Sequence, residues 1–260
     1  MTANVLATRL AGADLDWIIP DWPSAPRVHA FATTRNGGAS IGAHATLNLG
    51  DACGDDPAAV AENRRRVQSF LPSAPIWLRQ MHGDAVASIA SSTLDAARMH
   101  PPVADAAVTR EPCIVLGVMV ADCLPVLLAD GAGRVIGVAH AGWRGLAGGV
   151  VENVVTAMDV PPGEIIAWLG PAIGQRAFEV GEDVVAAFDD AGASPYFAAA
   201  KPGKWHADLY GIARAKLNRA GVRNIHGGGF CTFHDAARFF SYRRDRNTGR
   251  MAALLWLEPI

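Results

Sequence analysis

The chain has 260 residues, of which 50% are apolar, and its formal net charge is −2 at pH 7. This near-neutral balance excludes a nucleic-acid binder that acts through bulk positive charge, although it is compatible with a local anion site. The longest apolar run, residues 114–121, is far shorter than the ~20 residues that a membrane-spanning helix needs, so we expect no membrane partner.

The first half of the chain predicts short strands and one clear helix. Residues 1–26 contain turn formers without a regular period, which predicts an opening strand or arm. Residues 28–33 are typical of a strand that leads into a glycine-rich turn. Asp55-Asp56-Pro57 predicts the start of a helix, because acidic caps precede a proline. Residues 76–79 predict a strand that ends at Gln80-Met81-His82-Gly83-Asp84.

The centre of the chain predicts a β-hairpin. Two apolar runs, residues 124–129 and 134–139, flank the turn-forming segment Asp130-Gly131-Ala132-Gly133. If the loop is those four residues, Cys123 falls directly opposite His140. Cross-strand partners point to the same face with Cβ atoms about 4.5–5.5 Å apart. The hairpin therefore predicts a thiol and an imidazole within reach of one metal ion, or of each other.

The remaining elements complete an α/β pattern. His140 is followed by a glycine-rich entry, Ala141-Gly142-Trp143-Arg144-Gly145, to a helix that runs to about Met158. The pattern further predicts strands at 164–169, 239–244 and 250–257 and helices at 182–189 and 208–220. The last two strands predict a terminal hairpin. No repeat or linker interrupts the chain, so we expect a single domain over residues 1–260.

The cysteines and the N-terminus predict the compartment. The chain has four cysteines, Cys53, Cys113, Cys123 and Cys231, without a CxxC pair. Sparse cysteines in a long chain are typical of a reducing compartment. The first residues also lack a basic segment followed by an apolar one, the pattern of a secretory signal. We therefore expect a cytoplasmic protein.

His82 is the best third partner for Cys123 and His140, because it stands beside a glycine at a strand end. Two histidines and one cysteine with an open fourth position form the ligand set of a catalytic zinc site. Zinc in such a site keeps the cysteine as thiolate and lowers the pKa of a bound water to about 7.

Three alternatives stay open. A blue-copper centre uses the same ligands with a weak axial methionine, but a multicopper oxidase needs several His-x-His pairs, which this sequence lacks. Without a metal, Cys123 would attack a carbonyl carbon with His140 as base, oriented by Asp122 or Asp105. A zinc-stabilised binding module would need a fourth protein ligand.

Several motifs follow one another along the chain. They are Gln80-Met81-His82-Gly83, Ala121-Asp122-Cys123 with Leu124-Pro125-Val126, residues 140–145 and 170–174, Cys231-Thr232, and residues 239–245 with Thr248-Gly249-Arg250. In this order they closely resemble the YfiH-type laccase-domain family, whose members were once called multicopper polyphenol oxidases. The resemblance covers nearly the whole chain, from about Val28 to Leu257.

The resemblance implies a fold, a metal and an activity. The fold is an α/β (α+β) arrangement of mixed β-sheets in an α-β-β-α layered sandwich, similar to cysteine-hydrolase-like toxins. The family's metal-binding motifs fall on His82, Cys123 and His140, which implies zinc, with copper as the second choice. The implied enzyme is a purine nucleoside phosphorylase that uses phosphate to cleave adenosine, inosine or methylthioadenosine to free base and (methylthio)ribose 1-phosphate, and that also deaminates adenosine. The rival functions are a Cys–His hydrolase or amidase that acts on a carbonyl substrate such as a cell-wall precursor, and a copper-binding polyphenol oxidase.

These chemistries assign expected roles to residues. We expect Cys123, His140 and Asp122 to be catalytic, with Asp122 moving a proton during deamination. Phosphate must be held by cations and backbone donors, and Trp143 is a candidate to stack on the base. The predicted substrate-binding residues are Arg35, Arg144, Asn48 and Arg243. One departure from the family is visible: relatives often carry a histidine two residues after the Asn-Leu-Gly motif, where this chain has Ala52.

Overall fold

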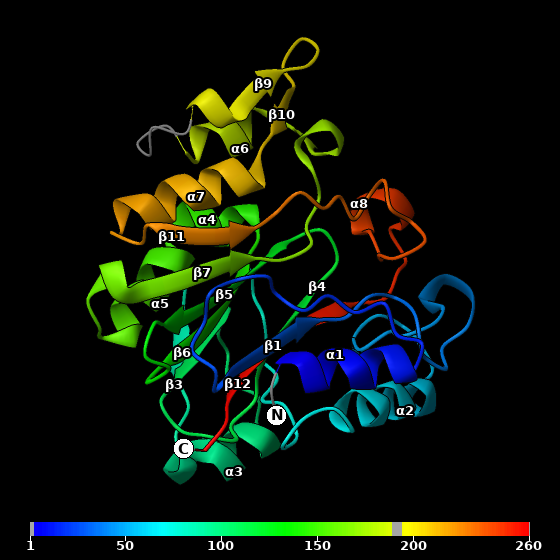
Figure 1. Cartoon of the computed structure of the whole chain (residues 1–260). Helices are drawn as coiled ribbons and strands as arrows, with labels where there is room; N and C mark the ends of the chain where they lie inside the picture. The colour runs from blue at the N-terminus through cyan, green and yellow to red at the C-terminus, as the bar shows by residue number, and fades with distance from the viewer. Residues whose placement is uncertain (1–2, 189–193, 260) are drawn as a thin grey trace.

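Two β-sheets pack face to face at the centre of the computed structural model, which describes residues 3–188 and 194–259 (Figure 1). The larger sheet has the strand order β11-β7-β5-β6-β3-β2. Its strands, in that order, are Asn224–Gly227, Ile165–Leu169, Leu124–Asp130, Ile136–Ala141, Ala106–Thr109 and Val86–Ser88. The pairs β11–β7 and β2–β3 are parallel and the other three pairs are antiparallel, so the sheet is mixed.

The second central sheet is antiparallel, with the order β1-β12-β4. Its strands are Val28–Ala32, Met251–Leu257 and Leu116–Val120. Alternation along β5 explains how the sheets are held together, because successive side chains of a strand point to opposite faces. Leu127 and Ala129 pack against the β1-β12-β4 sheet, whereas Val126 and Leu128 pack against helices.

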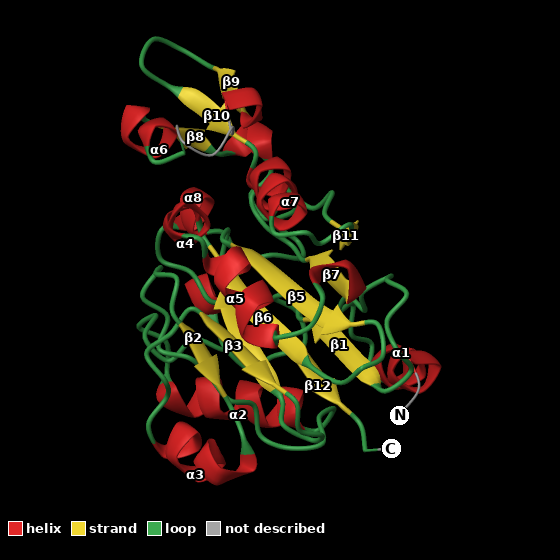
Figure 2. Ribbon diagram, turned by 90° about the vertical axis from the view of Figure 1, so that its left-hand side faces the viewer, coloured by secondary structure: helices red, strands yellow, loops and turns green. Residues whose placement is uncertain are grey.

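Helices cover the outer face of each sheet (Figure 2). The six-stranded sheet is covered by α4 (Trp143–Gly148), α5 (Val150–Met158) and α7 (Leu209–Arg219). The three-stranded sheet is covered by α1 (Ala3–Gly12) and α2 (Pro57–Gln68). The order of layers is therefore α-β-β-α, which confirms the expected fold class.

The other elements lie around these layers. Helix α3 (Ser91–Met99) follows β2, and α8 (Tyr242–Asp245) precedes β12. A small antiparallel sheet, with α6 (Glu182–Ala186) beside it, stands at one end of the molecule (Figure 1). Its strands are β8 (Glu179–Val180), β10 (Trp205–Ala207) and β9 (Phe197–Ala199). None of the helices in the described ranges is both long and apolar enough to span a bilayer.

The expected opening strand or arm is wrong, because the described part of the chain begins with helix α1. Leu6 and Leu10 are 1% and 3% exposed, and they pack beside Phe31 and Trp256 of the three-stranded sheet. Residues four apart lie on the same helix face. Two leucines at this spacing are therefore enough to bury a short amphipathic helix on the sheet.

The predicted register of the central hairpin is also wrong, by two residues. His140 pairs with Pro125, and Leu124 pairs with Ala141. The turn is longer than predicted because the Asp130 carboxylate accepts hydrogen bonds from the backbone N–H groups of Arg134 and Val135. A shift of two residues preserves the face to which each side chain points, whereas a shift of one would reverse it.

Two further predictions fail near the C-terminal half. Residues 239–244 do not form a strand: Phe239 and Phe240 fill a small core with Val120, and Ser241 caps the helical turn α8 by accepting a hydrogen bond from the Arg244 N–H. The terminal hairpin is therefore absent from the described chain, and β12 pairs with β1 and β4 instead.

The helix predicted to run from the glycine-rich entry to about Met158 is divided in two. Gly149 adopts a left-handed φ of 96° and ends α4 before α5 begins. The strand predicted at 76–79 is reduced to an isolated bridge between Ile76 and Leu116. The predicted helix 182–189 ends at Ala186, and its last residue lies outside the described ranges.

The other predicted elements are confirmed to within a few residues. They are the strands β1, β7 and β12 and the helices α2 and α7.

Candidate metal centre

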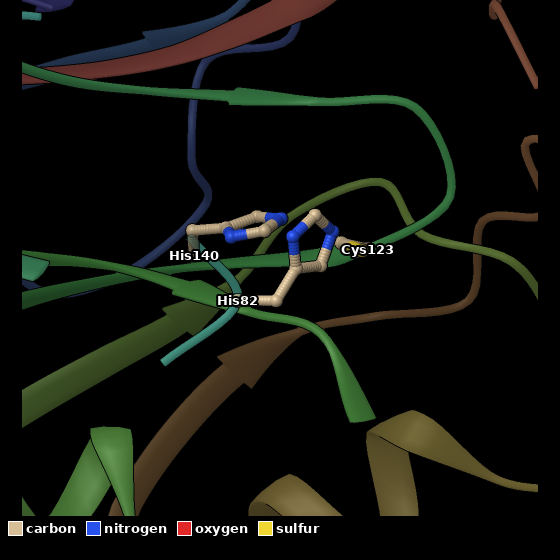
Figure 3. A group of neighbouring side chains, drawn as sticks. All are labelled: His82, Cys123 and His140. Atoms are coloured by element: carbon tan, nitrogen blue, oxygen red, sulfur yellow. The ribbon is translucent and has the colours of Figure 1, made fainter. Parts of the chain in front are cut away.

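Three metal-type side chains from separate parts of the chain point toward one another (Figure 3). His82 lies in the loop before β2, Cys123 directly precedes β5, and His140 lies on β6. One ligand atom from each residue lies within 4.8 Å of the other two. The two imidazole rings stand almost at right angles, with their centroids 4.8 Å apart. His140 is buried, whereas His82 is exposed, so the group opens to solvent on the His82 side.

The local backbone explains how the sequence achieves this convergence. His82 and Asp122 have left-handed φ angles of 61° and 90°, an uncommon conformation for residues other than glycine. Such outliers concentrate at functional sites. A Cβ atom at Gly142 would lie 2.9 Å from the Cys123 Sγ, so only glycine allows the entry to α4 to pass this close to the thiol.

Asp105 accepts hydrogen bonds from two of the three residues, His82 and His140. Its Oδ1 accepts hydrogen bonds from the His140 Nδ1, at 2.8 Å, and from the His82 backbone N–H, at 2.9 Å. Its Oδ2 accepts from the backbone N–H groups of Met81 and Gly83. With Nδ1–H bonded to Asp105, the neutral form of the His140 ring has its lone pair on Nε2. Metal-ligating histidines are typically oriented by a carboxylate in this way.

Burial and charge act against each other on these groups. Burial alone would raise the pKa of the Cys123 thiol, but the neighbouring His140 and His82 outweigh it and lower this pKa to about 6. Burial would lower the pKa of His140, but the Cys123 thiolate and Asp105 raise it to about 9. In the metal-free protein at neutral pH, the pair is therefore a thiolate beside an imidazolium.

The donor chemistry fits a metal ion. A thiolate and two imidazoles are ligands that zinc prefers, with bonds of about 2.3 Å to sulfur and 2.0–2.1 Å to nitrogen. Such bonds put the ligand atoms of a tetrahedral site roughly 3.3–3.6 Å apart, and the ligand atoms of this group lie within 4.8 Å of one another, so side-chain adjustments would bring all three to one ion. Three protein ligands leave one position of a tetrahedral site open, as in catalytic rather than structural zinc sites. A copper ion accepts the same donor set.

The group lines a cleft of about 590 Å³. Its lining includes Trp143 and Arg144 at the start of α4, and residues of α8 and the turn that follows it, which we call the α8 wall. Gln80 closes the wall near His82, because its side-chain amide donates to the Met119 carbonyl and accepts from the Met119 N–H. The aromatic residues of the lining are Trp143, Phe178 and Tyr242, and its arginines are Arg144, Arg243, Arg246 and Arg250.

The structure places two of the predicted substrate-binding residues in this cleft and two outside its lining. Arg144 and Arg243 line it, whereas Arg35 and Asn48 do not. The Arg35 guanidinium donates to the carbonyl oxygens of Ala45 and Ala236 and stacks on Phe240. These contacts hold loops together outside the lining of the cleft.

Asn48 acts in the same way as a buried connector. Its Nδ2 donates to the Gly50 carbonyl and to the Asp55 carboxylate, and its Oδ1 accepts from the N–H groups of Gly50 and Arg250. Gly50 and Arg250 both line the cleft. Asn48 thus shapes the wall without reaching the cavity.

Arg246, Arg250 and Tyr242 were not anticipated. The reason is the incorrect prediction of a terminal hairpin, which placed Tyr242 and Arg250 in its two strands and Arg246 in its turn. The signal that could have found them is the density of arginines, four in residues 243–250, beside two phenylalanines that must be buried. Asp105 was anticipated only as an alternative partner of His140.

Known proteins resemble this chain over nearly its whole length. The family model described as multi-copper polyphenol oxidoreductase laccase matches residues 29–258. A purine nucleoside phosphorylase of Pseudomonas aeruginosa is 49% identical over 93% of this chain and 98% of its own length. The purine nucleoside phosphorylase YfiH of Escherichia coli is 46% identical over 92% of this chain and 98% of its own length.

Solved structures show the same relationship. A Neisseria meningitidis protein, NMB0706, is 47% identical and superimposes with a TM-score of 0.89 over 94% of this chain and 100% of its own. YlmD of Geobacillus stearothermophilus is 34% identical, with a TM-score of 0.84 over 91% of this chain and 94% of its own. The chain therefore belongs to the multi-copper polyphenol oxidoreductase laccase family, the family of YfiH.

Proposed function

We propose that this protein is a purine nucleoside phosphorylase and that its reaction takes place in the cleft around His82, Cys123 and His140. The observation that carries the proposal is the convergence of these side chains in a cleft that is also lined by four arginines. The names of the relatives support the reaction class. The proposed substrates are adenosine, inosine and methylthioadenosine, with phosphate as the second substrate.

The proposed resident metal is zinc. A zinc ion held by His82, Cys123 and His140 would supply a Lewis acid at the floor of the cleft. The protein's own part is to keep the ligands in place: Asp105 fixes the tautomer of His140 and the loop that carries His82. Copper is the alternative metal, and metal analysis of the purified protein decides between the two.

In phosphorolysis, a phosphate oxygen forms a bond to C1′ of the ribose while the bond from C1′ to the purine nitrogen breaks. The base leaves with the electron pair and takes up a proton. Arg144 and Arg246 are the best candidate phosphate ligands of the cleft, because neither guanidinium has a hydrogen-bonded acceptor in the described chain: they lie over Trp143 and Tyr242, 4.2 Å and 5.4 Å from the ring centroids. Arg243 has one Nη already bonded to the Glu179 carbonyl. Trp143 and Tyr242 offer faces on which a purine can stack.

The second proposed activity is deamination of adenosine, in which water adds at C6 and ammonia leaves. The sequence names Asp122 as the residue that moves the proton. Its two carboxylate oxygens already accept hydrogen bonds from Thr232 and from the backbone of Arg243. This observation favours a positioning role for Asp122.

His140→Ala tests the proposal. We expect the variant to lose both its zinc and its nucleoside turnover by more than about 100-fold, because loss of even an outer-shell partner of a metal ligand costs about 10–100-fold. The measurements are elemental analysis and release of free base from inosine with phosphate. His100→Ala, at an exposed histidine after α3, is the control and should match the wild type. Full phosphorolysis by His140→Ala would overturn the proposed site.

One observation favours a second candidate function, a Cys–His hydrolase. His140 stands between Cys123 and Asp105, which is the order of a nucleophile, a base and an orienting carboxylate. Such an enzyme, for example an amidase acting on a cell-wall precursor, would keep its activity after a chelator and lose it to a thiol alkylator. A zinc-dependent phosphorylase would lose its activity to the chelator and regain it with added zinc.

A further inference from the structure

We propose that Asp122 is a positioning residue that joins the metal-ligand turn to the arginine-bearing α8 wall of the cleft. This inference rests on the proposed function, which makes the arginines of that wall phosphate ligands. The hydrogen bonds of Asp122 are observed without reference to any substrate. Asp122 directly precedes Cys123 and is 9% exposed. Its two carboxylate oxygens and its carbonyl oxygen are each bonded to a different segment of the chain.

The bonds of Asp122 converge from three directions. Its Oδ1 accepts from the Thr232 hydroxyl at 2.6 Å, and Thr232 is fully buried. Its Oδ2 accepts from the Arg243 backbone N–H at 2.6 Å. Its carbonyl oxygen accepts from the Ile173 N–H at 2.9 Å. These short bonds to a carboxylate are of the charge-assisted kind, which is roughly twice as strong as the neutral kind.

The bond to Arg243 matters because it falls in the first turn of α8. A carboxylate that accepts from a first-turn N–H satisfies a donor that the helix itself leaves free. Helix α8 and the residue after it bring Tyr242, Arg243 and Arg246 into the lining of the cleft. The position of these side chains therefore depends on the same carboxylate that begins the turn to Cys123.

The coupling continues through Arg243 to another lining residue of the cleft. The Arg243 guanidinium donates to the Glu179 carbonyl at 2.6 Å and lies over the Phe178 ring, 5.3 Å from its centroid. Phe178 also lines the cleft. The chain of contacts thus runs from the Cys123 turn through Asp122 and Arg243 to the small β8-β10-β9 sheet. We infer that loss of the Asp122 carboxylate disturbs both the metal ligand and the α8 wall.

Two substitutions separate positioning from proton transfer. In Asp122→Asn, the amide oxygen can accept from Arg243 while the amide N–H group donates to the Thr232 oxygen, since a hydroxyl both donates and accepts. We expect zinc content and the KM for phosphate to stay within about threefold of wild type, because neutral hydrogen bonds replace charge-assisted ones without moving the backbone. In Asp122→Ala no acceptor remains, and we expect the KM for phosphate and the dissociation constant for zinc each to rise about tenfold or more.

Zinc competition with a chelator, and KM and kcat for phosphorolysis and deamination, are measured on each variant. Thr232→Ser keeps the hydroxyl donor and Thr232→Val removes it, so Thr232→Val should have the higher KM for phosphate. This pair carries the test if Asp122→Ala does not fold.

Three results would contradict the positioning role. One is a loss of kcat for deamination of about 10²–10⁴ in Asp122→Asn with unchanged zinc binding and KM, the signature of a lost acid–base group. Another is wild-type zinc affinity in a folded Asp122→Ala. The third is an equal KM for phosphate in the two Thr232 variants. A wild type without any nucleoside turnover would refute the proposed function, while the zinc affinities would still test the role of Asp122.

Discussion

At the scale of single residues, the candidate centre depends on the buried carboxylate of Asp105, whose hydrogen-bond partners are all donors. Asp105 is 1% exposed and accepts from the His140 ring and from three consecutive backbone N–H groups, those of residues 81–83. Burial tends to raise the pKa of this carboxyl, but these hydrogen bonds lower it below its ordinary value, so Asp105 is ionised at neutral pH. An amide cannot satisfy the same four donors, because one of its two polar atoms is itself a donor.

Asp105→Asn should therefore lower zinc affinity by about 10–100-fold, the usual effect of losing an outer-shell carboxylate. It should also reduce the free energy of unfolding of the metal-free protein by roughly 1–3 kcal/mol, because buried donors lose their acceptor. Zinc competition and urea unfolding measure the two effects. Asp84→Asn, at an exposed carboxylate two residues after His82, is the control and should leave both unchanged. Wild-type zinc affinity in Asp105→Asn would show that Asp105 does not orient the centre.

At the scale of elements, the turn between β5 and β6 determines how His140 is presented. Asp130 is fully buried and accepts from the Arg134 and Val135 N–H groups and from the Arg134 guanidinium. Burial acts to raise the pKa of Asp130, but these hydrogen bonds outweigh it and lower the pKa below its ordinary value of 3.8. A carboxyl with a lowered pKa stabilises the folded state above its unfolded pKa. This stabilisation is lost as the pH falls through the folded value.

Asp130→Ala should lower the free energy of unfolding at pH 7 by roughly 1–3 kcal/mol, since backbone donors lose their acceptor inside the turn. The difference from wild type should shrink when the pH falls below about 3.8, because protonation removes the charge from the wild-type side chain as well. Urea unfolding of chelator-treated protein at pH 7 and pH 3 measures this. Asp95→Ala, at an exposed position of α3, should change stability by less than about 0.5 kcal/mol. An equal difference at both pH values would mean that the charge of Asp130 does not contribute.

The same turn shows what can be predicted from the sequence and what cannot. The apolar alternation of β5 and β6 predicts which side chains share a face of the sheet. This prediction holds although the predicted register is wrong, because a shift of two residues leaves each side chain on the same face. The length of the turn could not be predicted, since it depends on the hydrogen bonds of one aspartate. The role of Arg35 could not be predicted either. Its acceptors are the backbone carbonyl oxygens of Ala45 and Ala236, and every residue type has such an oxygen, so the sequence does not reveal the contact.

At the scale of the whole molecule, the α-β-β-α layers bring together side chains that are far apart in the sequence. Cys123 and His140 lie at the same end of neighbouring strands of the six-stranded sheet, and His82 reaches them from a separate loop (Figure 3). Helix α8 and the residue after it, near the C-terminus, add Tyr242, Arg243 and Arg246 to the lining of the same cleft. Because a metal ion would bind only the folded arrangement, its binding free energy adds to the stability of the fold.

Zinc should therefore raise the melting temperature of chelator-treated protein. Free zinc at about 100 times its dissociation constant adds about 2.7 kcal/mol, which corresponds to roughly 5–10 °C in a chain of this size. Thermal unfolding followed by circular dichroism, in a zinc titration, gives the shift. His140→Ala should show almost no shift, because one of its three ligands is missing, whereas His100→Ala should match the wild type. An equal shift in His140→Ala would show that the stabilising zinc binds at other residues. That result would contradict the claim that metal binding at the proposed centre stabilises the fold.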